Sequence, residues 1–278
     1  MPELPEVQAH AERLTAAYAE ATLERFRPLS FVALKTASPP PEDAYGRPLD
    51  AVTRRGKYLL ARFGDRTFVV HLMQGGRLKP DPKQAAKPRG GVARWLFADH
   101  PAWLLTEQGT EHKAGVWVMA GDPLIQAPLD SLGPEADQLD EATMAALLRQ
   151  QSMRLHGFLR DQHMLAGLGR RLANEVCWTA QLSPFASTSK LTDDEVARLV
   201  EAISTCVAEG LAYERTRDDM SSSAERPGAT HHRTGEPCPR CGDKVRAVEY
   251  RAYTVNYCPT CQTDGKILAD NTTSKFLK

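Results

Sequence analysis

Four cysteines near the end of the chain have the residue type and spacing of a metal site. Cys238 and Cys241 form one Cys-x-x-Cys pair, Cys258 and Cys261 form a second, and sixteen residues separate the two pairs. Two tight turns at this spacing bring four thiolates into a tetrahedron around Zn²⁺. Four protein ligands leave no open coordination position, so the sequence predicts one structural zinc ion. Disulfides or a redox pair are the alternative interpretation.

The segment around these cysteines is too short to bury a core of its own, so zinc should supply much of its folding free energy. Four cations around the hairpin predicted between the cysteine pairs favour contact with a phosphate backbone. They are Arg240, Lys244, Arg246 and Arg251. The alternative is that they are solvated charges on a stabilising module, and the residues alone leave both interpretations open.

The first residues offer a nucleophile. Met1 is followed by Pro2, whose small size permits removal of the initiator methionine. The exposed α-amine would titrate at about 8, against about 10.4 for lysine, so a larger share of it is neutral at pH 7. A secondary amine condenses with an aldehyde carbon to a cationic iminium, and the neighbouring Glu3 carboxylate could move protons. Many chains begin with Met-Pro-Glu by chance, so this pattern alone gives only a hypothesis.

Five motifs strengthen the hypothesis because they occur together over nearly the whole chain. They are MPELPEV at the start, RGKYLL at 55–60, His71-Leu72, Gly167-Leu168-Gly169, and the cysteine pairs ending in YCPTCQ. In this combination the sequence resembles the formamidopyrimidine-DNA glycosylase/endonuclease VIII family. Its ending, YCPTCQTDGKILADNTTSKFLK, is similar to an actinobacterial branch of that family.

The resemblance implies a base-excision-repair DNA glycosylase with AP lyase activity that acts on damaged DNA as a monomer. Pro2 would attack C1′ of the deoxyribose and form a Schiff base, while the damaged nucleotide is flipped out of the stack. The implied catalytic residues are Pro2, Glu3 and Lys57, with Glu6 in the pocket. The implied DNA-binding residues are His71, Gln74, His112, Lys113, Arg170 and Arg251.

Several positions differ from the family pattern. Arg170 stands where the family has asparagine, and Gln74 where it has methionine. Tyr253 replaces an arginine of the zinc hairpin, for which Arg251, on the same face of an ideal strand, could substitute. His112 and Ala114 stand where the family has arginine and phenylalanine.

These differences favour an altered choice of lesion: a pyrimidine, a single-stranded substrate or a bare abasic site. They also leave two alternatives open. One is a protein of the same fold that binds DNA damage and has lost or changed its glycosylase activity. The other is a zinc-ribbon adaptor whose N-terminal likeness is accidental.

The elements that must position these residues follow from the hydrophobic pattern. A helix is expected over Pro2–Ala19, and short alternating or apolar runs between Leu49 and Met119 predict a β-sandwich or barrel. Helical spacing follows, with a capping box from Thr192 to Glu195. Two loops are expected, Lys79–Gly91 and a mobile Arg215–His232 at the family's lesion-covering loop. The expected fold class is α+β: an N-terminal helix and β-sandwich over 1–130, a helix-two-turn-helix domain over 131–230 and a zinc hairpin over 231–278.

The composition sets limits. Lys plus Arg and Asp plus Glu number 35 each, so the formal net charge is zero. The distribution is uneven, with a net of +3 from His231 to Lys278 and −4 from Ala186 to Ala229. The sequence has no apolar run long enough to cross a bilayer and no secretory signal pattern, which favours a cytoplasmic, nucleoid-associated protein. Cys177 and Cys206 are expected in the core.

Overall fold

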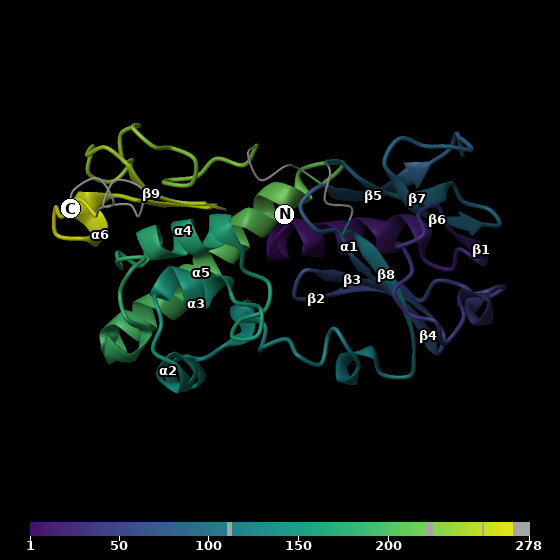
Figure 1. The fold of residues 1–278 in the computed structure, drawn as a ribbon, viewed down its shortest axis with the longest axis horizontal. Helices are drawn as coiled ribbons and strands as arrows, with labels where there is room; N and C mark the ends of the chain where they lie inside the picture. Colours follow the sequence, from purple (N-terminus) through teal and green to yellow (C-terminus); the bar gives the residue numbers. More distant parts are fainter. Residues whose placement is uncertain (110–112, 221–224, 252, 269–278) are drawn as a thin grey trace. The chain divides into compact units, whose positions relative to one another are not determined.

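The computed structural model describes residues 1–109, 113–220, 225–251 and 253–268, and it divides the chain into two compact units (Figure 1). The first unit comprises Met1–Ser131 together with Glu214–Met220, and the second comprises Leu132–Tyr213 and Ser221–Lys278. Among the described residues, no helix combines the length and the apolar character that crossing a bilayer requires.

The described part of the first unit is built on an N-terminal helix and two four-stranded antiparallel sheets. The helix is α1 (Leu4–Tyr18). One sheet has the order β1 (Leu23–Pro28), β6 (Gly91–Phe97), β7 (Ala102–Glu107) and β5 (Gly76–Asp81). The other has the order β2 (Ala51–Arg55), β3 (Tyr58–Phe63), β4 (Arg66–His71) and β8 (Gly115–Ala120). The expected helix and β-sandwich are confirmed.

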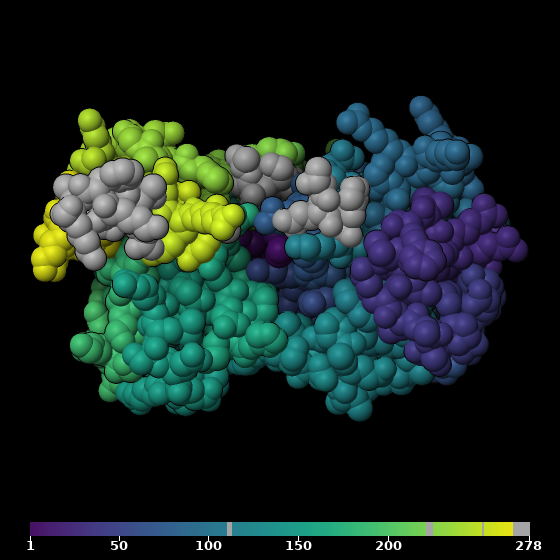
Figure 2. Space-filling model, in the orientation of Figure 1, coloured from purple at the N-terminus to yellow at the C-terminus, as the bar shows by residue number. Residues whose placement is uncertain are grey.

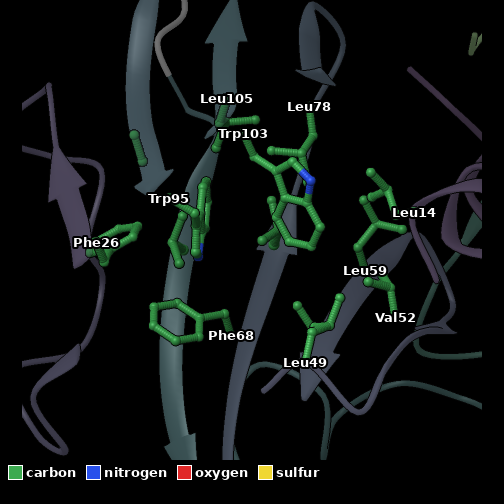
Figure 3. Close-up of a cluster of buried hydrophobic side chains, with 14 of the residues drawn as sticks. Leu14, Phe26, Leu49, Val52, Leu59, Phe68, Leu78, Trp95, Trp103 and Leu105 are labelled. Carbon is green, nitrogen blue, oxygen red and sulfur yellow. The ribbon is translucent and has the colours of Figure 1, made fainter. Parts of the chain in front are cut away.

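Aromatic and branched side chains of both sheets fill the core of this unit (Figure 3). Phe68 of one sheet meets Trp95 of the other with ring centroids 6.0 Å apart, and Trp95 also contacts Phe26 at 4.9 Å. Trp103 pairs with Trp95 on the neighbouring strand. Burial of such large rings gives the sandwich much of its stability, since each removes roughly 150–250 Å² from water.

Helix α1 packs its apolar stripe, Val7, Ala11, Leu14 and Tyr18, into the same core. It begins at Leu4 rather than at Pro2, because Glu3 has an extended backbone and caps the helix. This helix carries a buried histidine, His10. Its Nε2 lies 2.8 Å from the carbonyl oxygen of Leu78 in strand β5.

Two strands, β1 and β5, were not predicted from the sequence. The residues of β5 are Gly-Arg-Leu-Lys-Pro-Asp, and its second half falls in the segment expected to be a loop. β5 lies at the edge of its sheet, where a proline such as Pro80 is tolerated because one side of the strand needs no ladder hydrogen bonds. The loop begins only after Asp81 and projects from the first unit (blue in Figure 2).

The second unit is helical and ends in the zinc module. Its helices are α2 (Glu141–Gln150), α3 (Leu155–Arg160), α4 (Arg170–Thr179) and α6 (Pro259–Gln262), and the 23-residue α5 (Asp193–Arg215) begins in it. The capping box before α5 is confirmed: Thr192 N–H donates to Glu195 at 2.9 Å, and Glu195 N–H donates to the Thr192 hydroxyl at 3.3 Å. Cys177 and Cys206 are buried here, as expected.

The zinc module contains the hairpin of β9 (Arg246–Tyr250) and β10 (Tyr253–Tyr257). Tyr250 pairs with Tyr253, so Arg251 lies in the turn between the strands and is exposed. The argument that Arg251 shares a strand face with Tyr253 was therefore wrong, because strand alternation does not extend into a tight turn. Its contact with DNA stays a prediction.

Candidate active site and zinc centre

Pro2 and Glu3 lie directly before helix α1, and both are buried. The carboxylate of Glu6 accepts the backbone N–H of Glu3 at 2.9 Å and completes a capping box with it. Pro5 fits in the first turn because N–H groups there have no partner within the helix. The backbone that carries Pro2 is thus fixed by the side chain of Glu6.

Lys57 and His71 come together on neighbouring strands. Lys57 is buried in the turn before β3, and His71 ends β4, opposite Tyr58. Burial and the nearby positive charge of Lys57 lower the pKa of His71 to about 4, so its imidazole is neutral at pH 7. The His71 ring lies 4.4 Å from that of Tyr58, centroid to centroid. In the protein without DNA, His71 therefore carries no positive charge at neutral pH.

Arg54, which the sequence did not indicate, connects helix α1 to the turn that carries Lys57. Its Nε donates to Gln8 Oε1 at 3.2 Å, and its Nη1 donates to the carbonyl oxygen of Gly56 at 3.1 Å. Gly56 has a φ of 54°, a conformation that glycine adopts without steric cost. Arg54 thereby orients Lys57 relative to the helix that begins behind Pro2.

The turn after His71 presents Gln74, which is exposed. Met73 has a φ of 52°, packs against the sandwich core and places Sδ 2.8 Å from Nδ1 of His71. A Cβ on Gly75 would lie 2.1 Å from the carbonyl oxygen of Gln108, so this position requires glycine. The methionine of this turn is consequently half-buried against the core, and glutamine is the exposed residue.

A buried carboxylate shapes the entry into β8. Glu107 accepts the backbone N–H of Ala114 at 2.7 Å. Ala114 is buried, whereas Lys113 beside it is exposed. His112, predicted to contact DNA, lies outside the described residues.

Gln162 holds the Gly167-Leu168-Gly169 turn in front of α4. Its Oε1 accepts the N–H of Gly167 at 3.1 Å, and its Nε2 donates to the carbonyl oxygens of Leu168 and Arg160, both at 2.8 Å. Arg170 is the first residue of α4 and is half-buried. The dipole of a helix N-terminus favours an anion, so this position suits a phosphate contact by Arg170.

Arg171, unlike its neighbour, is a structural residue. It is buried, and its Nη2 donates to the carbonyl oxygens of Arg226 and Pro227, both at 2.6 Å. A substitution of Arg171 would therefore disturb the segment it holds, and it is unsuited to testing DNA contacts.

Glu175, one helical turn further along α4, binds the next part of that segment. Its carboxylate accepts backbone N–H groups from Ala229 at 2.6 Å, Thr230 at 3.1 Å and His231 at 2.7 Å. Residues 229–231 belong to the segment Arg215–His232 that the sequence predicts to be a mobile loop. Charge-assisted hydrogen bonds attach these residues to α4.

The four predicted zinc ligands converge. The sulfur atoms of Cys238, Cys241, Cys258 and Cys261 all lie within 4.8 Å of one another. Tetrahedral thiolates at a Zn–S distance of about 2.3 Å are about 3.8 Å apart, so the geometry fits one ion. The donor set is closed, as a structural site requires.

Helix α4 contributes to the surroundings of the zinc ligands through Trp178. Its Nε1–H donates to Cys238 Sγ at 3.3 Å. Burial raises the pKa of Cys238, but the bonds from Trp178 and from backbone N–H groups outweigh it and lower the pKa to about 6. Arg240 stacks on the Trp178 ring at 4.0 Å and donates to the Trp178 carbonyl oxygen at 2.9 Å. Arg240 thus joins the zinc module to α4. The sequence had suggested a phosphate contact or a solvated charge for this residue, and this contact is neither.

Comparison with known proteins identifies the family. A model of the formamidopyrimidine-DNA glycosylase N-terminal domain matches residues 1–109, a model of its H2TH domain matches 131–222, and a zinc finger found in FPG and IleRS matches 235–263. A formamidopyrimidine-DNA glycosylase from Chloroflexus aggregans is 31% identical over 276 residues, which cover 94% of this chain and 98% of the relative. The chain belongs to the formamidopyrimidine-DNA glycosylase family.

Other relatives agree with this assignment. A formamidopyrimidine-DNA glycosylase-like protein from Mycobacterium tuberculosis is 37% identical over 162 residues, covering 58% of this chain and all of the relative. The solved structure of MutM (Fpg) from Thermus thermophilus has a TM-score of 0.81 and 26% identity, covering 94% of this chain and 98% of that one. The formamidopyrimidine-DNA glycosylase fold is confirmed, while the actinobacterial branch stays a prediction.

Proposed function

We propose that this member of the formamidopyrimidine-DNA glycosylase family is a bifunctional DNA glycosylase and AP lyase of base-excision repair. Its nucleophile is the amine of Pro2, once Met1 is removed. The observation that carries the proposal is the fixed start of the chain, where Pro2 and Glu3 are buried and Glu6 binds the Glu3 backbone. A nucleophile held in this way loses little entropy when the sugar reaches it.

The chemistry follows from a secondary amine beside a carboxylic acid. The Pro2 nitrogen bonds to C1′ and gives its proton to the Glu3 carboxylate. The bond from C1′ to the base breaks, and its electron pair leaves on the base, which takes a proton from water. Glu3 then gives a proton to O4′ as the C1′–O4′ bond opens and the nitrogen forms an iminium. Loss of a proton from C2′ feeds electrons into the iminium and releases the 3′ phosphate, and water finally frees Pro2.

The remaining residues position the substrate. Lys57 donates to a phosphate near the lesion, His71 adds a hydrogen bond, and Glu6 lines the pocket in addition to supporting Glu3. The surface residues Gln74, Lys113, Arg170 and Arg251 contact DNA outside the pocket. Zinc keeps the C-terminal hairpin folded and takes no part in the reaction.

The substrate is damaged DNA. A Lactococcus lactis relative with 21% identity has been solved with abasic-site DNA and, separately, with DNA that contains an oxidised pyrimidine. Because Gln74 stands at the surface of its turn and Met73 is packed inside, the way in which this chain distorts the duplex differs from an apolar wedge. We therefore expect a changed lesion choice: an oxidised pyrimidine, a single-stranded substrate or an abasic site.

Borohydride reduction of the untagged protein mixed with abasic-site DNA tests the proposal. A covalent adduct is expected, together with release of bases from a panel of oxidised pyrimidines and purines. The Pro2→Ser variant should give no adduct, while Ser152→Ala, at an exposed serine of the second unit, should leave it unchanged. No adduct from the wild type, or an undiminished adduct from Pro2→Ser, contradicts the proposal.

A second candidate is a protein that binds damaged DNA without turnover. The exposed Gln74, and Tyr253 in the zinc hairpin, motivate it. Tight binding to an abasic analogue without trapping or base release over the whole lesion panel would favour this candidate. In either case we place the protein in the cytoplasm, on the nucleoid, as a monomer.

A further inference from the structure

Arg160, the last residue of α3, lies over an aromatic ring of the zinc hairpin. Its guanidinium carbon is 3.8 Å from the centroid of the Tyr253 ring. Tyr250 stacks on Tyr253 with centroids 4.7 Å apart and planes inclined by 14°, and the His156 ring lies nearly parallel to Tyr253 at 6.0 Å. The guanidinium therefore lies on a tyrosine ring that is itself packed against two further rings.

The hydrogen-bonding capacity of Arg160 is unused within the part of the chain that the structure describes. Its Nε is buried and has no hydrogen-bond acceptor. Its two terminal nitrogens do not belong to the buried nitrogen and oxygen atoms that lack a partner. The nearest carboxylate in sequence, Asp161, accepts the backbone N–H of His163 instead. A guanidinium has five N–H donors in one plane, and a ring stacked on it satisfies none of them.

Other arginines of the same unit differ from Arg160 in this respect. Arg171 donates to backbone carbonyls, Arg240 stacks on Trp178 but also donates to its carbonyl oxygen, and Arg149 pairs with Asp193 at 3.1 Å. Arg160 is stacked and oriented, yet its outward edge has no acceptor among the described residues. Such an edge matches the two oxygens of a phosphate.

A second cation strengthens the positive field at this surface. Arg154 lies over the Phe185 ring at 5.3 Å. Burial and Tyr253 raise the pKa of Tyr250, whereas the charges of Arg154 and Arg160 act to lower it, so both arginines lie within electrostatic range of Tyr250. We refer to Arg154, Arg160, Phe185, Tyr250 and Tyr253 as the arginine–aromatic patch.

The surrounding contacts make this patch rigid. Gln162 donates to the carbonyl oxygen of Arg160 and to that of Leu168, and so fixes the end of α3 against the turn before α4. His156 is buried, and its backbone N–H donates to the carbonyl oxygen of Pro184 at 2.9 Å. A donor that is already oriented loses less entropy on binding than one on a free side chain.

We propose that the arginine–aromatic patch binds a phosphodiester group of the DNA backbone, with Arg160 as a bidentate donor and Tyr253 as the surface that orients it. The inference rests on the proposed function in that the ligand is DNA. The Tyr253 ring is already covered by Tyr250 and Arg160, so it offers no free face on which a base could stack. The contact is therefore one with the backbone and does not depend on base sequence.

The salt dependence of DNA binding tests this proposal. Fluorescence anisotropy measures the Kd for a duplex that carries a tetrahydrofuran abasic analogue, at KCl concentrations from about 50 to 200 mM. Over this range each phosphate contact contributes to the slope of log Kd against log salt concentration. Arg160→Gln should reduce the slope of log Kd against log salt by about 0.9 and weaken binding about fivefold or more at low salt. The matched control is Arg149→Gln, an arginine of the same unit that forms an exposed ion pair, and its slope should equal that of the wild type.

Three further variants separate charge from orientation. Arg160→Lys should keep the slope but bind about threefold more weakly, since an ammonium neither stacks in a plane nor donates bidentately. Tyr253→Leu should do the same, whereas Tyr253→Phe should match the wild type. Zinc content and melting temperature, measured on each variant, exclude those that have lost the fold.

The outcomes distinguish this inference from the proposed function. If wild-type protein forms the borohydride adduct but folded Arg160→Gln keeps the full slope, the patch proposal is overturned and the chemistry stands. If the slope falls but no adduct forms, the patch stands and the enzymatic proposal fails. If the wild type binds no DNA, both are overturned.

Discussion

The carboxylate of Glu6 accepts the backbone N–H of Glu3 at 2.9 Å, so the residue beside the proposed nucleophile is anchored by the helix that follows it. Placing a glutamate pair at this helix start serves two purposes. It satisfies a donor that the helix cannot pair, and it fixes the carboxylic acid that the chemistry needs next to Pro2.

Removing this anchor should affect stability and activity together. Glu6→Ala leaves the Glu3 N–H buried without its acceptor, and we expect the free energy of unfolding to fall by about 1–2 kcal/mol, with a lower yield of borohydride adduct. Glu6→Gln keeps an oxygen that can accept the bond and should retain most of the stability. Glu12→Gln, on the same helix, is the control, because it weakens a solvent-accessible ion pair with Arg215 and keeps an oxygen that can accept from Gln8. Equal stability in Glu6→Ala and the wild type would contradict this account.

The segment 229–231 should loosen when its acceptor on α4 is removed. Glu175→Ala deprives three backbone N–H groups of a charged acceptor, and we expect a loss of about 2–4 kcal/mol in the free energy of unfolding. Hydrogen exchange at these three amides should become faster, while an exposed-site control on α5, Glu201→Gln, should not change them. Unchanged protection in Glu175→Ala would show that these bonds do not hold the segment.

Removal of zinc should change the fluorescence of Trp178, because the indole N–H of this residue donates to a cysteine ligand. The purified protein should contain one zinc per chain, and a strong chelator should shift the tryptophan emission and lower the melting temperature. Cys241→Ser should bind zinc more weakly, because three thiolates and a hydroxyl are a poorer donor set. Trp178→Phe should lose most of the emission change, since the other tryptophans lie in the first unit. A chelated protein with unchanged stability would contradict a structural role for zinc.

The pH dependence of stability should follow the buried histidines. Burial, the largest cause in each case, lowers the pKa of His10 and His71 to about 4 and that of His156 and His231 to about 3. The unfolded chain titrates near 6.5, so it binds more protons than the folded chain between about 4 and 6.5. Stability from these groups is complete above pH 6.5 and is lost as the pH falls.

We expect the free energy of unfolding to fall by about 1–2 kcal/mol per histidine between pH 7 and pH 5. Urea unfolding at a series of pH values measures this directly. His10→Gln, which keeps a donor for the Leu78 carbonyl, should flatten the profile, and the exposed His163→Asn should not. A stability that rises on acidification over this range would contradict the assignment of neutral buried imidazoles.

Much of the fold could be predicted from the sequence because its elements have strong local patterns. The apolar runs of β3 and β4 and the apolar stripe of α1 can each be recognised from a few residues. β5 and α3 could not be predicted in this way. β5 contains Gly, Lys and Pro and becomes a strand only because it pairs with β7, and α3 has six residues, too few to show a helical period.

The residues of the candidate site likewise divide into those that could be predicted from the sequence and those that could not. The zinc ligands could be predicted because their chemistry depends on local spacing, and the N-terminal motif through a combination of distant motifs. Arg54, Glu175 and Arg160 could not, because each acts on a partner far along the chain: Arg54 on Gln8, Glu175 on residues 54–56 positions later, and Arg160 on Tyr253. No local pattern distinguishes them from solvated charges.

The most direct test of the central claim is to locate the covalent bond. The protein, with its native N-terminus, is reduced with borohydride on abasic-site DNA, the DNA is digested away, and the peptides are sequenced by mass spectrometry. The account predicts a reduced sugar fragment on the nitrogen of Pro2 in a peptide that lacks Met1. A fragment on Lys57 or another lysine, or a retained Met1 on protein that still forms the adduct, would contradict it.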